Sequence, residues 1–159
     1  MHRLVIALIL VSCSSLCAQQ KWRGKEPGNE TGPVNGEAYQ KAIAPYVAKA
    51  RATYPAAKKR FLAGLPPNHT FYVWTRLYQE AAKGQRPRAE DVFIQVHTIE
   101  GGKVYGIIAN TPDLVTNYKQ GQRVQFPESD VLNWVIVRPD GSEEGNYVGK
   151  FLEKHYKIR

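Results

Sequence analysis

His97 is the residue whose type and position best suit acid–base chemistry, because an imidazole changes charge near neutral pH. It ends the alternating stretch Val92–His97, which is typical of a strand. Glu128 and Asp130 flank a predicted turn and offer paired carboxylates, which do acid–base work where their environments separate their pKa values. A small hydrolase using His97 with Asp130 or Glu128 is one hypothesis, and an exposed histidine with exposed turn acids is the simpler alternative.

The remaining histidines give no metal-binding pattern. His69 lies in a predicted turn and His155 near the C-terminus, and no pair has a His-x-x-x-His spacing. Phosphate-binding, serine-nucleophile and dinucleotide motifs are also missing from the sequence. We therefore expect no metal and no cofactor. A three-histidine zinc site is an alternative that requires the fold to bring residues 69, 97 and 155 together.

Four residues at predicted strand ends and turns suggest a recognition surface. Tryptophan and tyrosine often anchor interfaces, and an asparagine adds hydrogen-bonding capacity. The alternative for Trp134 is a core position, since it lies within an apolar strand. The predicted binding residues are Trp134, Tyr105, Tyr118 and Asn110.

The chain is basic, with 22 Lys and Arg against 14 Asp and Glu, a formal charge of +8. Such a charge suits an anionic partner, here an envelope component or an acidic protein, although it also serves solubility. The cationic residues form two clusters, Lys58-Lys59-Arg60 and the stretch 83–88 with Arg86 and Arg88. No nucleic-acid partner is expected, because an exported protein seldom meets one.

Residues 1–18 have the pattern of a secretory signal peptide. Arg3 forms a basic region, residues 4–11 are apolar, and Leu16-Cys17-Ala18 resembles a cleavage site. We therefore expect export to the periplasm or the outside, with about +7 charges left once Arg3 is removed. No stretch reaches the roughly 18 apolar residues that span a bilayer.

A lipoprotein is the alternative form of export. Leu10-Val11-Ser12-Cys13 resembles a lipobox, which would leave Cys13 as the lipidated N-terminus. Cleavage after residue 18 would instead remove both cysteines, leaving no thiol for disulfides, nucleophiles or metal ligands. Residues 19–36 are rich in glycine and proline and predict a flexible tether.

Residues 37–65 predict helices. Apolar residues recur three or four apart at Tyr39, Ile43, Val47, Ala50 and Tyr54. Pro45 predicts a kink or a new start, and Thr53-Tyr54-Pro55 predicts a break between two helices. Gly64 and the prolines after Leu65 end the helical region.

The rest of the chain predicts antiparallel strands. Residues 70–77 form the first strand, with aromatics on both faces, so we expect both faces to be covered. Residues 92–109 form a hairpin, because Gly101-Gly102 suits a tight turn. Further strands are expected at 123–126 and 131–137, with a helical or irregular piece at 114–118. Residues 147–152 are expected as a last strand or a short closing segment.

Several of these motifs resemble the YegJ-like bacterial family of unknown function, number 2314 of its series. Departures include Asn133 for a usual aspartate, Phe93 or Ile94 for a tryptophan, and 148–150 for a threonine–arginine segment. The resemblance implies no activity, and chemistry that needed that aspartate or arginine would be lost here. The similar segments are Ala50–Pro55, Glu90–Val96, Gly106–Pro112, Gly121–Phe126, Val131–Trp134 and Gly145–Leu152.

Together these patterns predict one α+β domain over residues 37–159, with the family-like part at about 50–152. Helices would pack on one face of a curled antiparallel sheet of about five or six strands, with a partly closed barrel as the alternative. The first functional hypothesis is a non-enzymatic binding or interaction module. The alternatives are the small hydrolase and a binder of anionic envelope polymers.

Overall fold

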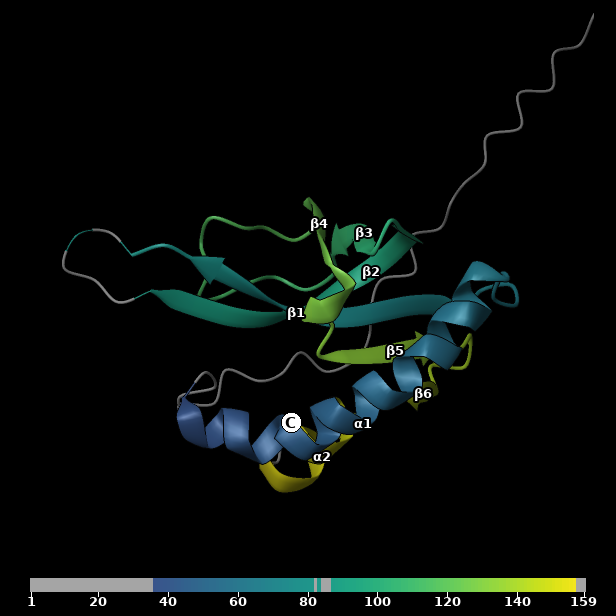
Figure 1. The fold of residues 1–159 in the computed structure, drawn as a ribbon, viewed down its shortest axis with the longest axis horizontal. Coiled ribbons are helices and arrows are strands. Elements are labelled where there is room, and N and C mark those ends of the chain that lie inside the picture. Colours follow the sequence, from purple (N-terminus) through teal and green to yellow (C-terminus); the bar gives the residue numbers. More distant parts are fainter. Residues whose placement is uncertain (1–35, 82, 84–86, 157–159) are drawn as a thin grey trace, which may run out of the picture.

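A long helix comes first, followed by a six-stranded antiparallel sheet and a short C-terminal helix (Figure 1). The computed structural model describes residues 36–81, 83 and 87–156. The predicted signal peptide, Cys13, residues 19–35 of the tether, and Arg86 lie outside the described residues. The elements are α1 (Glu37–Leu62), β1 (Thr70–Gln79), β2 (Arg88–Glu100), β3 (Lys103–Ile108), β4 (Arg123–Pro127), η1 (Glu128–Asp130), β5 (Asn133–Val137), β6 (Glu143–Gly145) and α2 (Tyr147–Tyr156).

The predicted break in the first helical region is wrong, because α1 runs without interruption through Pro45 and Pro55. Within the predicted break, the Thr53 hydroxyl donates to the carbonyl oxygens of Lys49 at 3.0 Å and Ala50 at 3.1 Å inside the same helix. Ala50, Tyr54 and Ala57 are buried on both sides of Pro55. Packing of this stripe holds the helix together where the local proline signal favours a stop.

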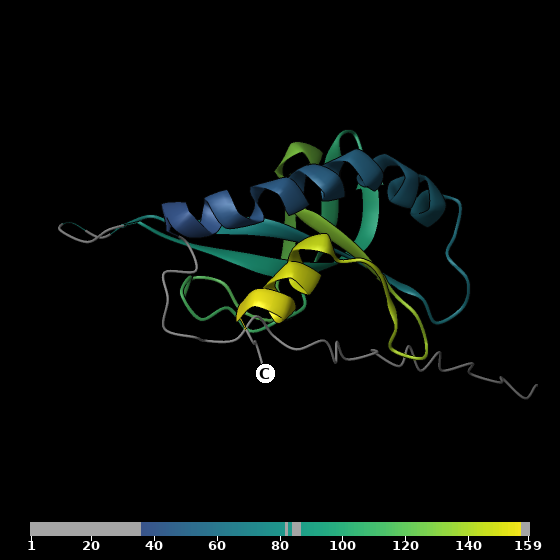
Figure 2. The ribbon, with the colours of Figure 1, turned by 90° about the horizontal axis from the view of Figure 1, so that it is seen from below.

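The sheet has the strand order β4-β3-β2-β1-β5-β6 and is not closed, so the α+β prediction is confirmed and the barrel alternative is not. The central strands β1 and β2 pair over eight positions, from Tyr72 opposite Gln95 to Gln79 opposite Arg88. Both helices pack against β5, on one side of the strand order, as Figures 1 and 2 show. Within the described ranges, neither helix has the length and apolar character that a bilayer span requires.

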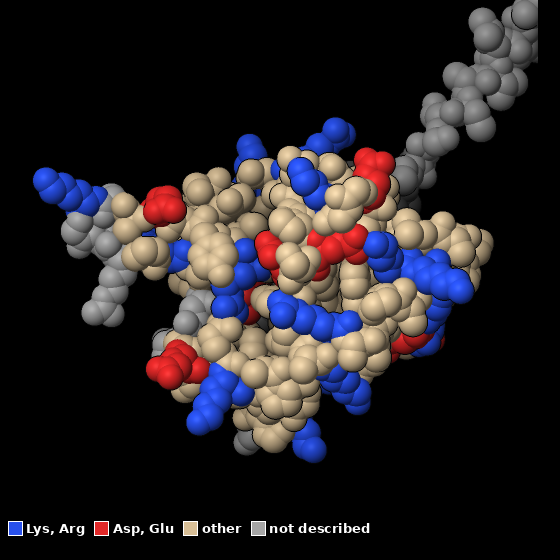
Figure 3. All heavy atoms as spheres, in the orientation of Figure 1, with Lys and Arg blue, Asp and Glu red and all other residues tan. Residues whose placement is uncertain are grey.

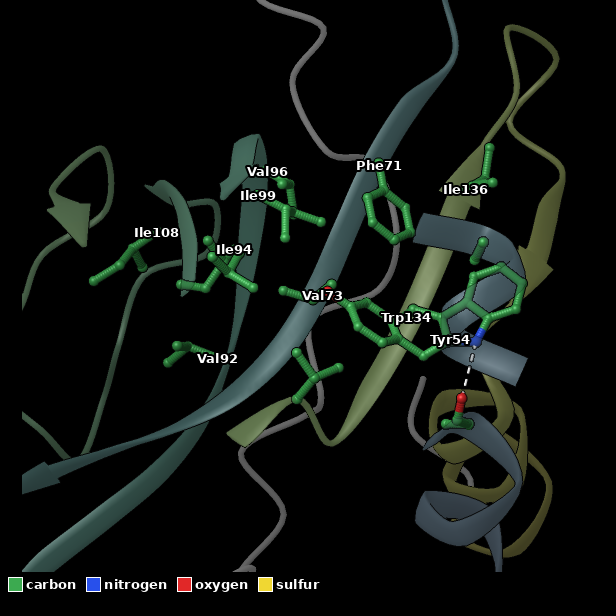
Figure 4. Close-up of a cluster of buried hydrophobic side chains, with 14 of the residues drawn as sticks. Tyr54, Phe71, Val73, Val92, Ile94, Val96, Ile99, Ile108, Trp134 and Ile136 are labelled. Atoms are coloured by element: carbon green, nitrogen blue, oxygen red, sulfur yellow. Dashed lines mark hydrogen bonds between the residues drawn. The ribbon is translucent and has the colours of Figure 1, made fainter. Parts of the chain in front are cut away.

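Both faces of β1 are buried, as its aromatic pattern predicts. Phe71 and Val73 belong to one hydrophobic cluster, drawn in Figure 4, while Tyr72 and Trp74 belong to a second cluster. Helix α1 supplies residues to both, with Ala50, Tyr54 and Ala57 in the first, and Tyr39 and Ile43 in the second. The helix therefore ties together the two layers that the sheet separates.

The predicted central hairpin is confirmed. Gly101 and Gly102 have φ values of 56° and 72°, the left-handed region that a tight turn between β2 and β3 requires. The pairing of β2 with β3 shifts register between Val96 and Thr98, so His97 is the extra residue of a β-bulge. The bulge places His97 at the surface, where it is exposed.

The closing segment is a helix and not a strand. Asn146 has φ 51°, which turns the chain sharply after β6, and α2 begins at the next residue. Val148 and Leu152, four residues apart, are buried in the second cluster, and Phe151 stacks on Tyr46 of α1 at 4.3 Å between ring centroids. An i, i+4 apolar pair over so short a stretch also fits an alternating strand, which explains why a strand was one of the two alternatives expected here.

Candidate functional site

The three residues of the hydrolase hypothesis are not joined by hydrogen bonds. Glu128 accepts hydrogen bonds from Tyr54 at 3.2 Å and Lys58 at 2.7 Å, while Asp130 accepts one from Ser129 at 3.1 Å. Burial and then the Glu128 charge raise the pKa of Tyr54, which keeps the phenol protonated as a donor. Among residues 36–81, 83 and 87–156, no hydrogen bond or ion pair links His97 to either acid.

The other histidines are placed apart in different contexts. His69 Nδ1 lies 3.1 Å from the Pro67 carbonyl oxygen, and His155 packs against Phe151 at the end of α2. No group of three histidine, cysteine, aspartate or glutamate side chains in the described part of the chain is arranged to hold a metal ion. A zinc site assembled from residues 69, 97 and 155 is therefore not among the arrangements that these residues form.

The four predicted recognition residues do not share one surface. Trp134 is 4% exposed, and its indole N–H donates to Thr53 Oγ1 at 2.9 Å and to the Ala50 carbonyl at 3.2 Å, a core position (Figure 4). Asn110 is buried, and its Oδ1 accepts a hydrogen bond from the Phe93 amide at 2.8 Å. Tyr118 packs against the first cluster, and half-buried Tyr105 lies on β3.

The basic cluster on α1 is largely engaged in ion pairs. Lys58 pairs with Glu128, and Arg60 and Arg138 both pair with Glu144, which joins α1, the residue after β5, and β6. The hydrogen bond from Arg60 lowers the pKa of Glu144 below its usual range. Lys59 is exposed, as is Arg88 at the start of β2. These contacts leave less free charge on this cluster than the sequence suggests.

Sequence patterns missed a buried ion pair between neighbouring strands. Arg76 on β1 donates from Nε to Asp91 Oδ1 at 2.6 Å and from Nη2 to Oδ2 at 2.8 Å. Tyr39 of α1 approaches the same carboxylate at 3.3 Å. The side chains are 17% exposed for Arg76 and 5% for Asp91, lower than in the ion pairs of Lys58, Arg60 and Arg138. The residues lie 15 positions apart, and only the register of β1 on β2 places them opposite each other.

The comparisons with known proteins bear on this arrangement. The model of a family described as an uncharacterised protein conserved in bacteria, DUF2314, matches residues 36–156. The chain belongs to the DUF2314 family. It is also 29% identical over 70 residues to the uncharacterised protein YegJ of Escherichia coli strain K12, which covers 44% of this chain and 46% of YegJ. The match thus spans about half of that relative, and no solved structure matches the chain.

The family-like motifs of this DUF2314 domain hold backbone segments together. Gly106 sits where a β-carbon would come within 2.2 Å of the Gln95 carbonyl oxygen, so its lack of a side chain lets β3 approach β2. Asn133, buried on β5, donates to Asn146 Oδ1 at 3.0 Å, and Asn146 donates to Glu143 at 2.5 Å. These side-chain bonds connect β5, β6 and the start of α2.

Glu90 has a comparable role that sequence patterns did not reveal. Its carboxylate accepts hydrogen bonds from the backbone amides of Asp113, Leu114 and Val115 at 2.7 to 3.2 Å. A carboxylate that gathers three amides fixes an irregular segment to the strand that carries it. The loop between β3 and β4 is therefore fastened near the start of β2.

Replacing Glu90 with glutamine is expected to loosen this loop, because an amide keeps one acceptor oxygen and adds donors that face backbone N–H groups. The amides of residues 113–115 should exchange with solvent about fivefold faster, corresponding to a loss of roughly 1 kcal/mol. Hydrogen exchange followed by NMR measures this. Glu100→Gln, at the exposed end of the hairpin, is the matched control, and equal exchange in both variants would contradict the assignment.

Proposed function

We propose that this DUF2314 protein is an exported, non-enzymatic binding module that contacts its partner through the outer face of β2, β3 and β4. The outer face is defined by five residues whose neighbours along each strand point into the first hydrophobic cluster. These residues are Gln95, Tyr105, Ile107, Arg123 and Gln125.

The observation that carries the proposal is the contrast between this face and three acids of the domain whose hydrogen bonds are internal. Glu90, Asp91 and Glu128 are each committed to internal hydrogen bonds. In the outer face, Gln95, Ile107 and Arg123 stand opposite one another across three strands, and Tyr105 stands opposite Gln125. Both helices pack mainly against β5, and Tyr39 of α1 also reaches Asp91 of β2, so the β3 and β4 part of this row lies away from them.

The composition of the outer face also supports binding. Arginine and tyrosine contribute strongly at protein interfaces, and here they flank a half-buried isoleucine. The predicted signal peptide would bring this face into the bacterial envelope, where anionic polymers and proteins are abundant. A basic protein meets such partners by long-range attraction, which raises the rate of association.

Site-specific photo-crosslinking tests the proposal. A benzophenone amino acid in place of Tyr105 should capture a partner in the envelope fraction of the bacterium that encodes the protein. The same amino acid in place of Ala52, exposed on α1, is the control and should capture little. Capture at Ala52 with none at Tyr105 would contradict the proposed face, and recovery of the protein solely from the cytoplasm would contradict export.

A further inference from the structure

We infer that β4 is an open docking edge, at which an acidic, extended segment of a partner protein adds a seventh strand to the sheet. This inference rests on the proposed binding function and names the chemistry of the partner. A sheet edge offers main-chain donors and acceptors to any extended chain, so each protein must either block its edges or use them.

The hydrogen-bond pattern shows which groups of β4 face outward. The Ile108 amide donates to the Gln122 carbonyl at 3.0 Å, and the Glu128 amide donates to the Gly102 carbonyl at 2.9 Å. Antiparallel ladders alternate with a period of two, so Val124 and Phe126 also direct their main-chain groups toward β3. Arg123 and Gln125 therefore direct their N–H and C=O groups away from the sheet. In the described part of the chain, no strand pairs with that side.

The opposite edge of the sheet, at β6, has its outward carbonyl groups bonded by a side chain. In β6, Glu143 and Gly145 have their carbonyl groups on the outer side, by the same alternation. The ammonium group of Lys150 on α2 donates to both of these oxygens, at 3.4 Å for Glu143 and 2.8 Å for Gly145. A helix side chain thus occupies the β6 edge, whereas among the described residues no strand pairs with the outer side of the five-residue β4.

Charge indicates which kind of chain suits the β4 edge. Arg123 lies on β4 and Lys119 just before it, while Lys103 lies on β3, opposite Pro127 of β4. All three are exposed. No ion pair holds any of these three cations among the described residues, in contrast with Lys58, Arg60 and Arg76. Glu100, opposite Lys103, and Asp130, just after β4, are the acids beside them. Figure 3 shows both basic and acidic side chains at the upper side of the molecule, where Figure 1 labels β3 and β4.

A second copy of this chain is a poorer occupant than an acidic segment. Pairing two β4 edges would bring Arg123 and its neighbouring lysines against the same cations of the partner, in a protein of net charge +8. Like charges placed opposite each other on strands are destabilising. An acidic chain would instead neutralise them while forming main-chain hydrogen bonds.

Amide hydrogen exchange with a defined probe tests the inference. The probe is an eight-residue peptide that alternates valine and glutamate and is blocked at both ends, and the matched control carries lysine in place of glutamate. The acidic peptide should slow exchange of the Arg123 and Gln125 amides and leave Val124 and Phe126, already bonded to β3, unchanged. No protection of residues 123 and 125, or equal protection by the lysine peptide, would overturn the inference.

Two substitutions separate edge pairing from contact with the outer face. Gln125→Pro removes an outward N–H, which an edge strand tolerates, and should weaken peptide binding about tenfold or more. Gln125→Ala removes the same side chain but keeps the N–H, so the about tenfold weakening is measured relative to this variant and isolates the main-chain hydrogen bond. If the partner crosslinks at position 105 but the amides of residues 123 and 125 stay unprotected with the acidic peptide, edge pairing is refuted and the proposed outer face is not. If protection of the Arg123 and Gln125 amides rises with protein concentration in the absence of peptide, self-association occupies the edge, which would overturn the inference of an acidic partner.

Discussion

Gly145→Ala is expected to lower the free energy of unfolding by roughly 2–4 kcal/mol, because it combines a steric clash with backbone strain. A β-carbon at this position would lie 2.6 Å from the Trp134 carbonyl oxygen and 2.7 and 2.8 Å from carbons of its indole ring. The residue also has φ +80°, a conformation that side chains disfavour. Trp134 is held by hydrogen bonds to α1 and packs against Tyr147, so it cannot move aside without loss.

Gly141→Ala is the matched control, because Gly141 has the same φ of +80° and a β-carbon there would have no heavy atom within 4 Å. It should cost about 1 kcal/mol, the conformational term alone. Urea unfolding followed by tryptophan fluorescence gives both values. Equal losses in the two variants would show that the approach of β6 to Trp134 contributes nothing to stability.

The parts of this fold that sequence patterns predicted are those governed by neighbouring residues. The Gly101-Gly102 turn, the alternation along Val92–Val96 and the two-sided burial of β1 all follow from local chemistry, and the structure confirms them. The same reasoning failed at Pro55 and at α2. There, contacts with strands far away in the sequence decide whether a helix continues or forms at all.

The candidate site shows the same division. For Trp134, its place in an apolar strand indicates a core position as the alternative to a binding surface, and its burial agrees. No pattern in the neighbouring sequence indicates that Glu90 and Asp91 are structural residues. Their hydrogen-bond partners are brought close only by the register of β1 on β2 and by the path of the loop after β3. The open β4 edge is likewise a property of strand order, which periodicity alone does not supply. Nonlocal pairing therefore determines both the stabilising acids and the proposed binding surface.

Asp91→Ala is expected to lower the free energy of unfolding by about 3–5 kcal/mol, since it leaves the Arg76 guanidinium buried without its partner. The side chains are 17% exposed for Arg76 and 5% for Asp91, so water replaces the lost carboxylate poorly. Burial lowers the pKa of Arg76, but the hydrogen bond and charge of Asp91 outweigh it and raise that pKa overall. An arginine cannot escape the cost by releasing its proton near neutral pH.

The double variant Arg76→Met with Asp91→Leu decides whether the charge pair or its environment matters. Replacing both charges with apolar groups removes the unpaired charge, so most of the lost stability should return. Glu153→Ala, an exposed acid on α2, is the control and should change stability by no more than about 0.5 kcal/mol. If the double variant were as unstable as Asp91→Ala, the loss would arise from strand packing and not from an isolated guanidinium. If the double variant regains stability and still crosslinks to its partner through a benzophenone amino acid at position 105, the ion pair supports the outer face without taking part in binding.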